Sequence, residues 1–143
     1  MSDDPFQLYN DTLLAYVAEV GDGRRLDRPD TMAKAVSPVC GSEVTLFLNI
    51  KDGRIQDVGY EVEACALTKT VMAVFLKAAP GLDRNGIDSA AQGFEQWLSR
   101  ATDELPPGWS ELDVLAPARD YTARHNSMLL PFTAALKALD KSG

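Results

Sequence analysis

A change of periodicity in the middle of the chain limits its fold more than any other feature. Apolar residues occupy alternate positions from Val44 to Ile50, and the alternation resumes from Val58 to Val62. A period of two predicts β-strands that bury one face. The tripeptide Lys51-Asp52-Gly53 lies between these segments, and Asp-Gly tolerates the positive φ of a tight hairpin turn. The two segments are therefore expected to pair as antiparallel strands.

At Cys65 the period changes from two to 3.6, the value of an α-helix. The apolar residues that follow share one helical stripe; they are Leu67, Val71, Val74, Phe75 and Ala78. Pro80-Gly81 then predicts the end of the helix. Cys65 is therefore expected to lie where a strand gives way to a helix.

The N-terminal part carries a second helical signal. A helix is expected from about Pro5 to Val20, because Asp4 can cap it and its apolar residues recur at helical spacing. Gly21 can close that helix. The following segment, 21–30, has little apolar surface to bury and is expected to be a loop.

The remaining elements complete an α+β fold. A strand is expected to begin near Met32 and to join the hairpin, and helices are expected over 87–101 and from about Leu130. A short helical turn is expected at 110–113. The predicted architecture is a three-stranded antiparallel sheet packed against helices, in one domain over residues 1–143.

Composition excludes several classes of partner. The net charge is −7 and the longest run of cationic residues is Arg24-Arg25, so binding to nucleic acid is not expected. The longest apolar stretch, 71–76, is too short to span a bilayer, and the acidic start lacks the features of a secretion signal. We therefore expect no membrane partner and a cytoplasmic location, where Cys40 and Cys65 would be thiols.

The two cysteines flank the predicted hairpin. Cys40 precedes its first strand and Cys65 follows its second, so antiparallel pairing can bring the two thiols together. A thiol at a helix N-terminus feels the positive end of the helix dipole, which favours the thiolate. The alternative is that both cysteines are small buried hydrophobic residues.

Three segments favour the first of these alternatives through a resemblance. They are Pro38-Val39-Cys40-Gly41-Ser42, Ala64-Cys65-Ala66-Leu67-Thr68, and the stretch from Arg124 through Ser127 to Leu130-Pro131-Phe132. In order and spacing they resemble motifs of the NifU/IscU/SufU family of iron–sulfur cluster assembly scaffolds. The long segment between the second and third motifs is similar to that of the SufU branch. The resemblance implies an IscU/SufU-like fold.

The resemblance also implies a function. In SufU-like proteins three cysteines and one aspartate bind zinc, and the first cysteine takes sulfur from a cysteine desulfurase. In IscU-like proteins the same ligands hold a nascent iron–sulfur cluster. The implied partners are a cysteine desulfurase and an iron–sulfur apoprotein or carrier. The implied role is that of a scaffold rather than an enzyme, although sulfur transfer with the desulfurase would be a reaction.

Two of the four implied ligand positions are altered. Cys40 matches the sulfur acceptor and first metal ligand, and Cys65 matches the second, but Ser42 replaces the aspartate and Ser127 replaces the third cysteine. A serine hydroxyl keeps its proton at neutral pH and is a poor ligand. His125 could offer one nitrogen as a third ligand. The implied zinc ion or iron–sulfur cluster is therefore expected to be bound weakly or not at all.

These residues leave three hypotheses open. The first is a scaffold or sulfur acceptor of iron–sulfur cluster assembly, with Cys40 as the acceptor and Cys65 as a further ligand. The second is a degenerate member of the family that acts as a protein-binding or regulatory module, which Ser42 and Ser127 favour. The third is a redox switch in which the two cysteines form a reversible disulfide.

Overall fold

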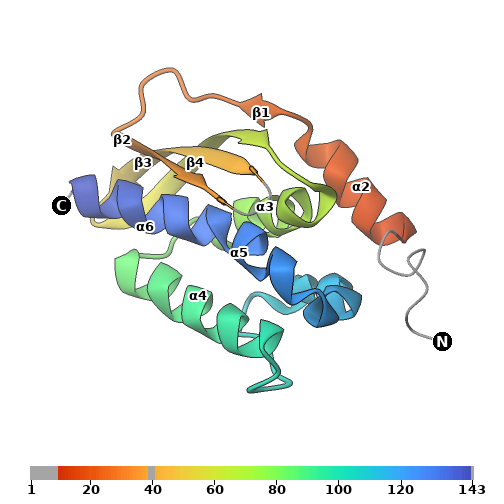
Figure 1. Cartoon of the computed structure of the whole chain (residues 1–143). Helices are drawn as coiled ribbons and strands as arrows, with labels where there is room; N and C mark the ends of the chain where they lie inside the picture. The colour runs from red at the N-terminus through yellow and green to blue at the C-terminus, as the bar shows by residue number, and fades with distance from the viewer. Residues whose placement is uncertain (1–9, 39–40, 143) are drawn as a thin grey trace.

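Helices cover one face of a four-stranded antiparallel sheet in the computed structural model, which describes residues 10–38 and 41–142 (Figure 1). The strands lie in the order β1-β4-β3-β2. Their bounds are Gly23–Arg24 for β1, Thr31–Val36 for β2, Glu43–Lys51 for β3 and Arg54–Glu63 for β4. The predicted α+β class is confirmed, and the sheet has one strand more than the predicted three.

The predicted hairpin forms between β3 and β4. Its register runs from Glu43 opposite Glu63 to Lys51 opposite Arg54. Asp52 and Gly53 take φ values of 55° and 77°, the left-handed conformation that a tight turn requires. Because the strands are antiparallel, the residue before β3 and the residue after β4 leave the sheet at the same end. This end carries the candidate site.

The extra strand lies in the segment predicted to be a loop. Strand β1 pairs with β4, and the amide of Val62 donates to the carbonyl oxygen of Asp22 over 2.9 Å. A Cβ on Gly23 would lie 2.6 Å from the carbonyl oxygen of Tyr60, and one on Gly59 would lie 2.8 Å from that of Arg24. Two glycines therefore permit the close backbone approach. Side-chain periodicity could not reveal a two-residue strand held by backbone contacts.

The helices form two layers beside the sheet. Helix α6 packs against β2 and β3, α3 and α4 pack against α6, and α2 packs against α3 (Figure 1). Their bounds are Asp11–Val20 for α2, Ala66–Ala78 for α3, Arg84–Leu98 for α4, His125–Met128 for α5 and Leu130–Ser142 for α6; 3₁₀-helices span Ser110–Asp120 (η1) and Thr122–Arg124 (η2). Among the described residues, no helix has the length and apolarity needed to cross a membrane.

The first described helix is shorter than predicted. Asn10 is extended and caps α2 by accepting a hydrogen bond from the amide of Leu13 over 2.9 Å. Helix α2 therefore begins at Asp11, whereas the predicted helix was expected to run through Asn10. The predicted stretch 5–9 and the predicted cap Asp4 lie outside the described residues. The helix ends at Val20, as predicted, and Gly21 follows with φ 59°.

The C-terminal region differs from the prediction in its lengths. The expected turn at 110–113 is the beginning of η1, which continues to Asp120. Helix α6 begins at Leu130, as predicted, but the short helix α5 precedes it. Pro117 lies inside η1 and lacks an amide proton, so an unbroken α-helix is unfavourable in this segment.

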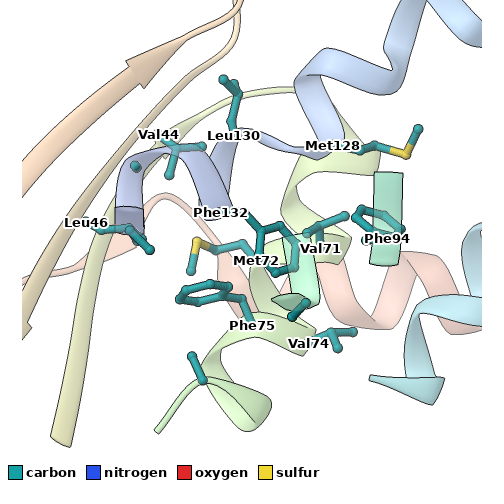
Figure 2. Packing of buried hydrophobic residues seen from close by; sticks show 14 of the residues in the cluster. Val44, Leu46, Val71, Met72, Val74, Phe75, Phe94, Met128, Leu130 and Phe132 are labelled. Atoms are coloured by element: carbon teal, nitrogen blue, oxygen red, sulfur yellow. The ribbon is translucent and has the colours of Figure 1, made fainter. Parts of the chain in front are cut away.

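The core lies between the sheet and the helices (Figure 2). Val44 and Leu46 of β3 point toward Met72 and Phe75 of α3. Phe132 of α6 is central to an aromatic cluster. Its ring centroid lies 5.5 Å from that of Phe75, 5.8 Å from that of Phe94 and 5.0 Å from that of Trp109. These contacts hold α3, α4 and α6 together and fix the position of the chain just before α6.

Candidate functional site

Cys65 lies at the junction predicted from the sequence, between β4 and α3. It is the N-cap residue of α3, with φ −69° and ψ 167°, and its side chain makes no capping hydrogen bond. The thiol is half-buried and its Sγ lies 3.5 Å from Oγ1 of Thr68. The sulfur is therefore at the positive end of α3 and is held there by a neighbour one turn further on.

Thr68 joins Cys65 to the C-terminal motif. Its hydroxyl donates to the backbone carbonyl oxygen of Ser127 over 3.0 Å, and both residues are fully buried. Because Thr68 has a single hydroxyl proton, Sγ of Cys65 is the donor in its contact with Oγ1. A continuous chain of hydrogen bonds thus runs from the thiol to α5. The structure brings the second and the third motif together.

The first motif lies at the same end of the sheet. The amide of Ser37 donates to the carbonyl oxygen of Ser42 over 2.8 Å, and the amide of Gly41 donates to that of Ser37 over 2.9 Å. Gly41 has φ 73°, which favours glycine. Ser42 is buried and directly precedes Glu43 at the end of β3. Cys40 lies outside the described residues, so its predicted role stays a prediction.

One ring nitrogen of His125 is bonded to the backbone. Its Nε2 donates to the backbone carbonyl oxygen of Arg119 over 3.0 Å. The guanidinium of Arg119 lies 4.5 Å from the ring centroid of Trp97, which fixes this part of the chain. Only Nδ1 of His125 is left for a ligand. Its role as a third ligand stays a prediction.

The described donor set does not fit a closed metal site. Across 10–38 and 41–142, no group of three His, Cys, Asp or Glu side chains could hold a metal ion together. The Sγ of Cys65 contacts the hydroxyl of Thr68, and that hydroxyl bonds to the backbone of Ser127. Protonated hydroxyls are weak ligands for zinc, which prefers thiolate, imidazole and carboxylate. These residues supply one good ligand.

The outer face of the same sheet end is acidic. A hollow of about 290 Å³ is lined there by Lys34, Glu43, Thr45, Glu61 and Glu63. Lys34 Nζ lies 2.8 Å from a carboxylate oxygen of Glu43, and this hydrogen bond raises the pKa of Lys34. The carboxylates face solvent on the side opposite to the buried serines, so they add charge near the site without offering it a ligand.

Two residues of the site were missed from the sequence. Thr68 stands in the second motif, three residues after the cysteine, where a side chain often contacts the helix cap. That spacing could have revealed it. Ser37 is 1% exposed and its hydroxyl has no hydrogen-bond partner in the described part of the chain. Only a three-dimensional structure could reveal this.

Comparisons with known proteins agree with the fold and with the motifs. No protein-family model matches the chain. A curated relative, the iron–sulfur cluster assembly scaffold protein IscU of Thermotoga maritima, is 22% identical over 134 residues, which are 94% of each chain. The crystal structure of an N-terminal nitrogen-fixing NifU-like protein from Brucella abortus is 29% identical, with a TM-score of 0.85 over 95% of this chain and 94% of that one.

A further solved structure shares the fold at lower identity. It is the putative iron–sulfur cluster assembly scaffold protein for the SUF system from Fervidobacterium islandicum. The TM-score is 0.76 and the identity 20%, over 92% of this chain and 96% of that one.

Proposed function

The chain is a NifU/IscU/SufU-like protein, and on that premise we propose that it accepts sulfur for iron–sulfur cluster assembly at a metal site weakened by two serines. The similar proteins that carry a functional name are called cluster assembly scaffolds. We propose that this chain has the same general role in cluster assembly, and that its site differs because serines stand at two of the implied ligand positions.

The contact between Thr68 and Ser127 carries the proposal. Through Thr68, the backbone of Ser127 is tied to the turn that begins at Cys65. This is the arrangement expected if the third ligand of the family stood at 127. The residue present there has a hydroxyl in place of a thiol. The connection between the second and third motifs, together with the hydroxyl at 127, supports the proposal of a family site that binds metal weakly.

Cys40 is the proposed acceptor. Its thiolate would attack the outer sulfur of a persulfide on the cysteine desulfurase. One sulfur–sulfur bond forms on Cys40, the bond in the donor breaks, and the desulfurase cysteine leaves as a thiolate. No oxidant or reductant is consumed. An iron–sulfur apoprotein or a carrier would then take the sulfur, and the reducing cytoplasm is the compartment in which both thiols would stay available.

Zinc or a cluster would be held poorly by this chain. A tetrahedral zinc site needs four donors, and Ser42 and Ser127 supply protonated hydroxyls at two of the four implied positions. Cys40, Cys65 and Nδ1 of His125 remain as candidate ligands. A nascent cluster on this chain would lack some of its protein ligands. Sulfur transfer is therefore better supported than cluster assembly on the chain itself.

The second candidate function is a protein-binding or regulatory module without sulfur chemistry. The two serines favour it, because a chain that no longer holds metal could keep the fold for docking alone. It differs from the first in one measurable respect. A docking module would bind a partner equally well after its cysteines were replaced, whereas a sulfur acceptor would lose its activity with Cys40.

Sulfur transfer is tested by incubating the protein with a cysteine desulfurase and cysteine and locating the persulfide by peptide mass spectrometry. Trypsin separates the two thiols, because Cys40 lies in peptide 35–51 and Cys65 in peptide 55–69. We expect the added sulfur on peptide 35–51, and its loss in Cys40→Ala but not in Cys65→Ala. Sulfur on neither peptide, with desulfurase that still releases sulfide, would contradict the proposal and favour the docking module.

A further inference from the structure

Strand β2 forms one edge of the sheet, and part of its backbone points away from β3. Hydrogen-bonded and open residue pairs alternate along antiparallel strands. The amide of Ser37 bonds to the carbonyl oxygen of Ser42 over 2.8 Å, which makes this a hydrogen-bonded pair directly after β2. The alternation then turns the amide and carbonyl groups of Met32, Lys34 and Val36 outward. The edge therefore presents a row of backbone groups to a further strand.

Two lysines of α6 contact the outward carbonyl groups. Helix α6 runs beside β2 (Figure 1). Nζ of Lys141 lies 3.1 Å from the carbonyl oxygen of Met32, and Nζ of Lys137 lies 3.4 Å from that of Lys34. Lysine side chains at a strand edge protect it from unwanted pairing. Because an ammonium group can cover only acceptors, the outward amides of β2 stay available as donors.

The two ammonium groups have no carboxylate beside them. Within 10–38 and 41–142, neither Lys137 nor Lys141 forms a salt bridge, although the net charge of the chain is −7. Lys34 differs, because its Nζ lies 2.8 Å from a carboxylate oxygen of Glu43. The edge of β2 therefore carries two positive charges that an acidic partner could neutralise.

The spacing of the lysines matches that of an added strand. Residues four positions apart lie about 6 Å apart along a helix, and alternate residues of a strand lie about 6.6–6.8 Å apart. Carboxylates at alternate positions could therefore meet both lysines. The other side chains of such a strand would lie beside Met32 and Val36, which are 46% and 50% exposed on the outer face of the sheet.

We propose that the edge of β2 binds an extended segment of a partner protein, in which acidic and apolar residues alternate, as a further strand of the sheet. Its backbone would pair with Met32, Lys34 and Val36, and its carboxylates would take Lys137 and Lys141 from the carbonyl oxygens. A second copy of this chain fits poorly, because pairing β2 with β2 would bring the lysines of both copies together. The inference stands whether or not the protein accepts sulfur.

NMR titration of the full chain with synthetic peptides tests the inference. The probe is the acetylated and amidated heptapeptide SEVEVES, which carries glutamates at alternate positions with valines between them. We expect its addition to shift the amide signals of Met32, Lys34 and Val36 and to slow their hydrogen exchange. The neutral peptide SQVQVQS should bind about fivefold more weakly, because it cannot form ion pairs with the two lysines. Equal binding by the two peptides, or no shift at these amides, would overturn the inference.

Paired substitutions locate the charges that the probe contacts. Lys137→Gln with Lys141→Gln should weaken the binding of SEVEVES about fivefold, while glutamine still offers a donor to the carbonyl oxygens. Lys51→Gln with Arg124→Gln is the matched control, since it removes the same charge from two exposed residues outside this edge. At about 0.15 M salt, where distant charges are screened, the control should bind normally. Equal weakening by both pairs would contradict the proposed contact with α6.

Methylated probes test strand addition without altering the protein. Residues paired across two strands share a face, so the valines of the probe would pair with the outward groups of β2 and the glutamate amides would point away. N-methylation of the two valines should weaken binding at least about tenfold, and N-methylation of two glutamates should leave it unchanged. Equal effects would show that the probe does not add as a strand. Self-association of the chain that shifts the same amides would assign the edge to a second copy and overturn the inference.

Discussion

The hydroxyl of Thr68 donates a hydrogen bond to the backbone carbonyl oxygen of Ser127 over 3.0 Å, although 59 positions separate the two residues. Both side chains are fully buried. This bond ties the first turn of α3 to α5, and Cys65 reaches the same hydroxyl. The two motifs therefore share one buried polar connection, which gives the site a fixed geometry.

Thr68→Val should test this connection. Valine keeps the shape of threonine and leaves the carbonyl oxygen of Ser127 without its side-chain donor, so we expect the free energy of unfolding to fall by about 1–2 kcal/mol. Thr70→Val in the same helix should cost less, because its hydroxyl bonds to a carbonyl that is already part of the helix. Urea denaturation followed by circular dichroism measures the loss of unfolding free energy in each variant. Equal losses would mean that the bond from Thr68 to Ser127 stabilises the protein no more than the bond within the helix.

Gly59→Ala should weaken the contact between β1 and β4. An added Cβ would lie 2.8 Å from both the carbonyl oxygen of Arg24 and the amide nitrogen of Leu26, and backbone atoms cannot move as a side-chain end can. We expect a loss of about 1–3 kcal/mol in the free energy of unfolding. Hydrogen exchange should be faster at Val62, whose amide bonds to Asp22. Unchanged exchange at this amide would contradict the predicted displacement of β1.

Arg119→Lys should destabilise the segment that leads to α5. The guanidinium stacks on Trp97 and donates to the carbonyl oxygens of Trp97 and Thr102, and a lysine cannot reproduce this planar set of donors. We expect the free energy of unfolding of Arg119→Lys to fall by about 1–3 kcal/mol. Arg100→Lys is the control, since its ion pair is exposed and should change the free energy by less than about 0.5 kcal/mol. Similar effects at the two arginines would refute this account.

The pair of Tyr16 and Glu111 should make stability depend on pH at both extremes. Its 2.6 Å hydrogen bond and burial raise the pKa of Tyr16 from 10.0 to about 12. The same hydrogen bond lowers the pKa of Glu111 below 4.5. Stabilisation linked to Tyr16 is full below pH 10.0 and is lost as pH rises toward 12. That linked to Glu111 is full above pH 4.5 and is lost as pH falls through the lowered pKa.

Tyr16→Phe provides the comparison for this pH dependence. The difference in free energy of unfolding between the two proteins should be constant from pH 4.5 to 10.0 and should shrink outside that range. Chemical denaturation at closely spaced pH values gives the difference. A difference that stays constant up to pH 12 would show that the tyrosine proton is not held by the pair.

The sequence predicted those parts of the fold in which side chains carry the signal. The hairpin turn at Asp52-Gly53 and the boundary at Cys65 follow from periodicity and turn chemistry, and the structure has both. Strand β1 was missed because backbone bonds and the two glycines, Gly23 and Gly59, hold it without an apolar pattern. The predicted continuity of the first helix through Asn10 was wrong, because Asn10 is extended and caps α2 at Asp11.

The candidate site was predictable to a smaller extent. The motif resemblance gave the positions of Cys65 and Ser127, and the structure connects them through Thr68. The unpartnered hydroxyl of Ser37 depends on which groups surround a buried atom, and no spacing in the sequence encodes this. The anchoring of His125 by Arg119 likewise depends on how η1 folds against α4.

The measurement that tests the central claim most directly is the zinc affinity of the unmodified protein and of a variant with Ser42→Asp and Ser127→Cys. Both are titrated against a colorimetric chelator in the absence of oxygen. Because the substitutions supply a carboxylate and a thiol at the two altered positions, the variant should bind zinc strongly, while the unmodified protein should lose zinc to a mild chelator. Equal and tight binding by the unmodified protein would show that His125 or another residue completes the site, and would contradict the claim that the two serines weaken it.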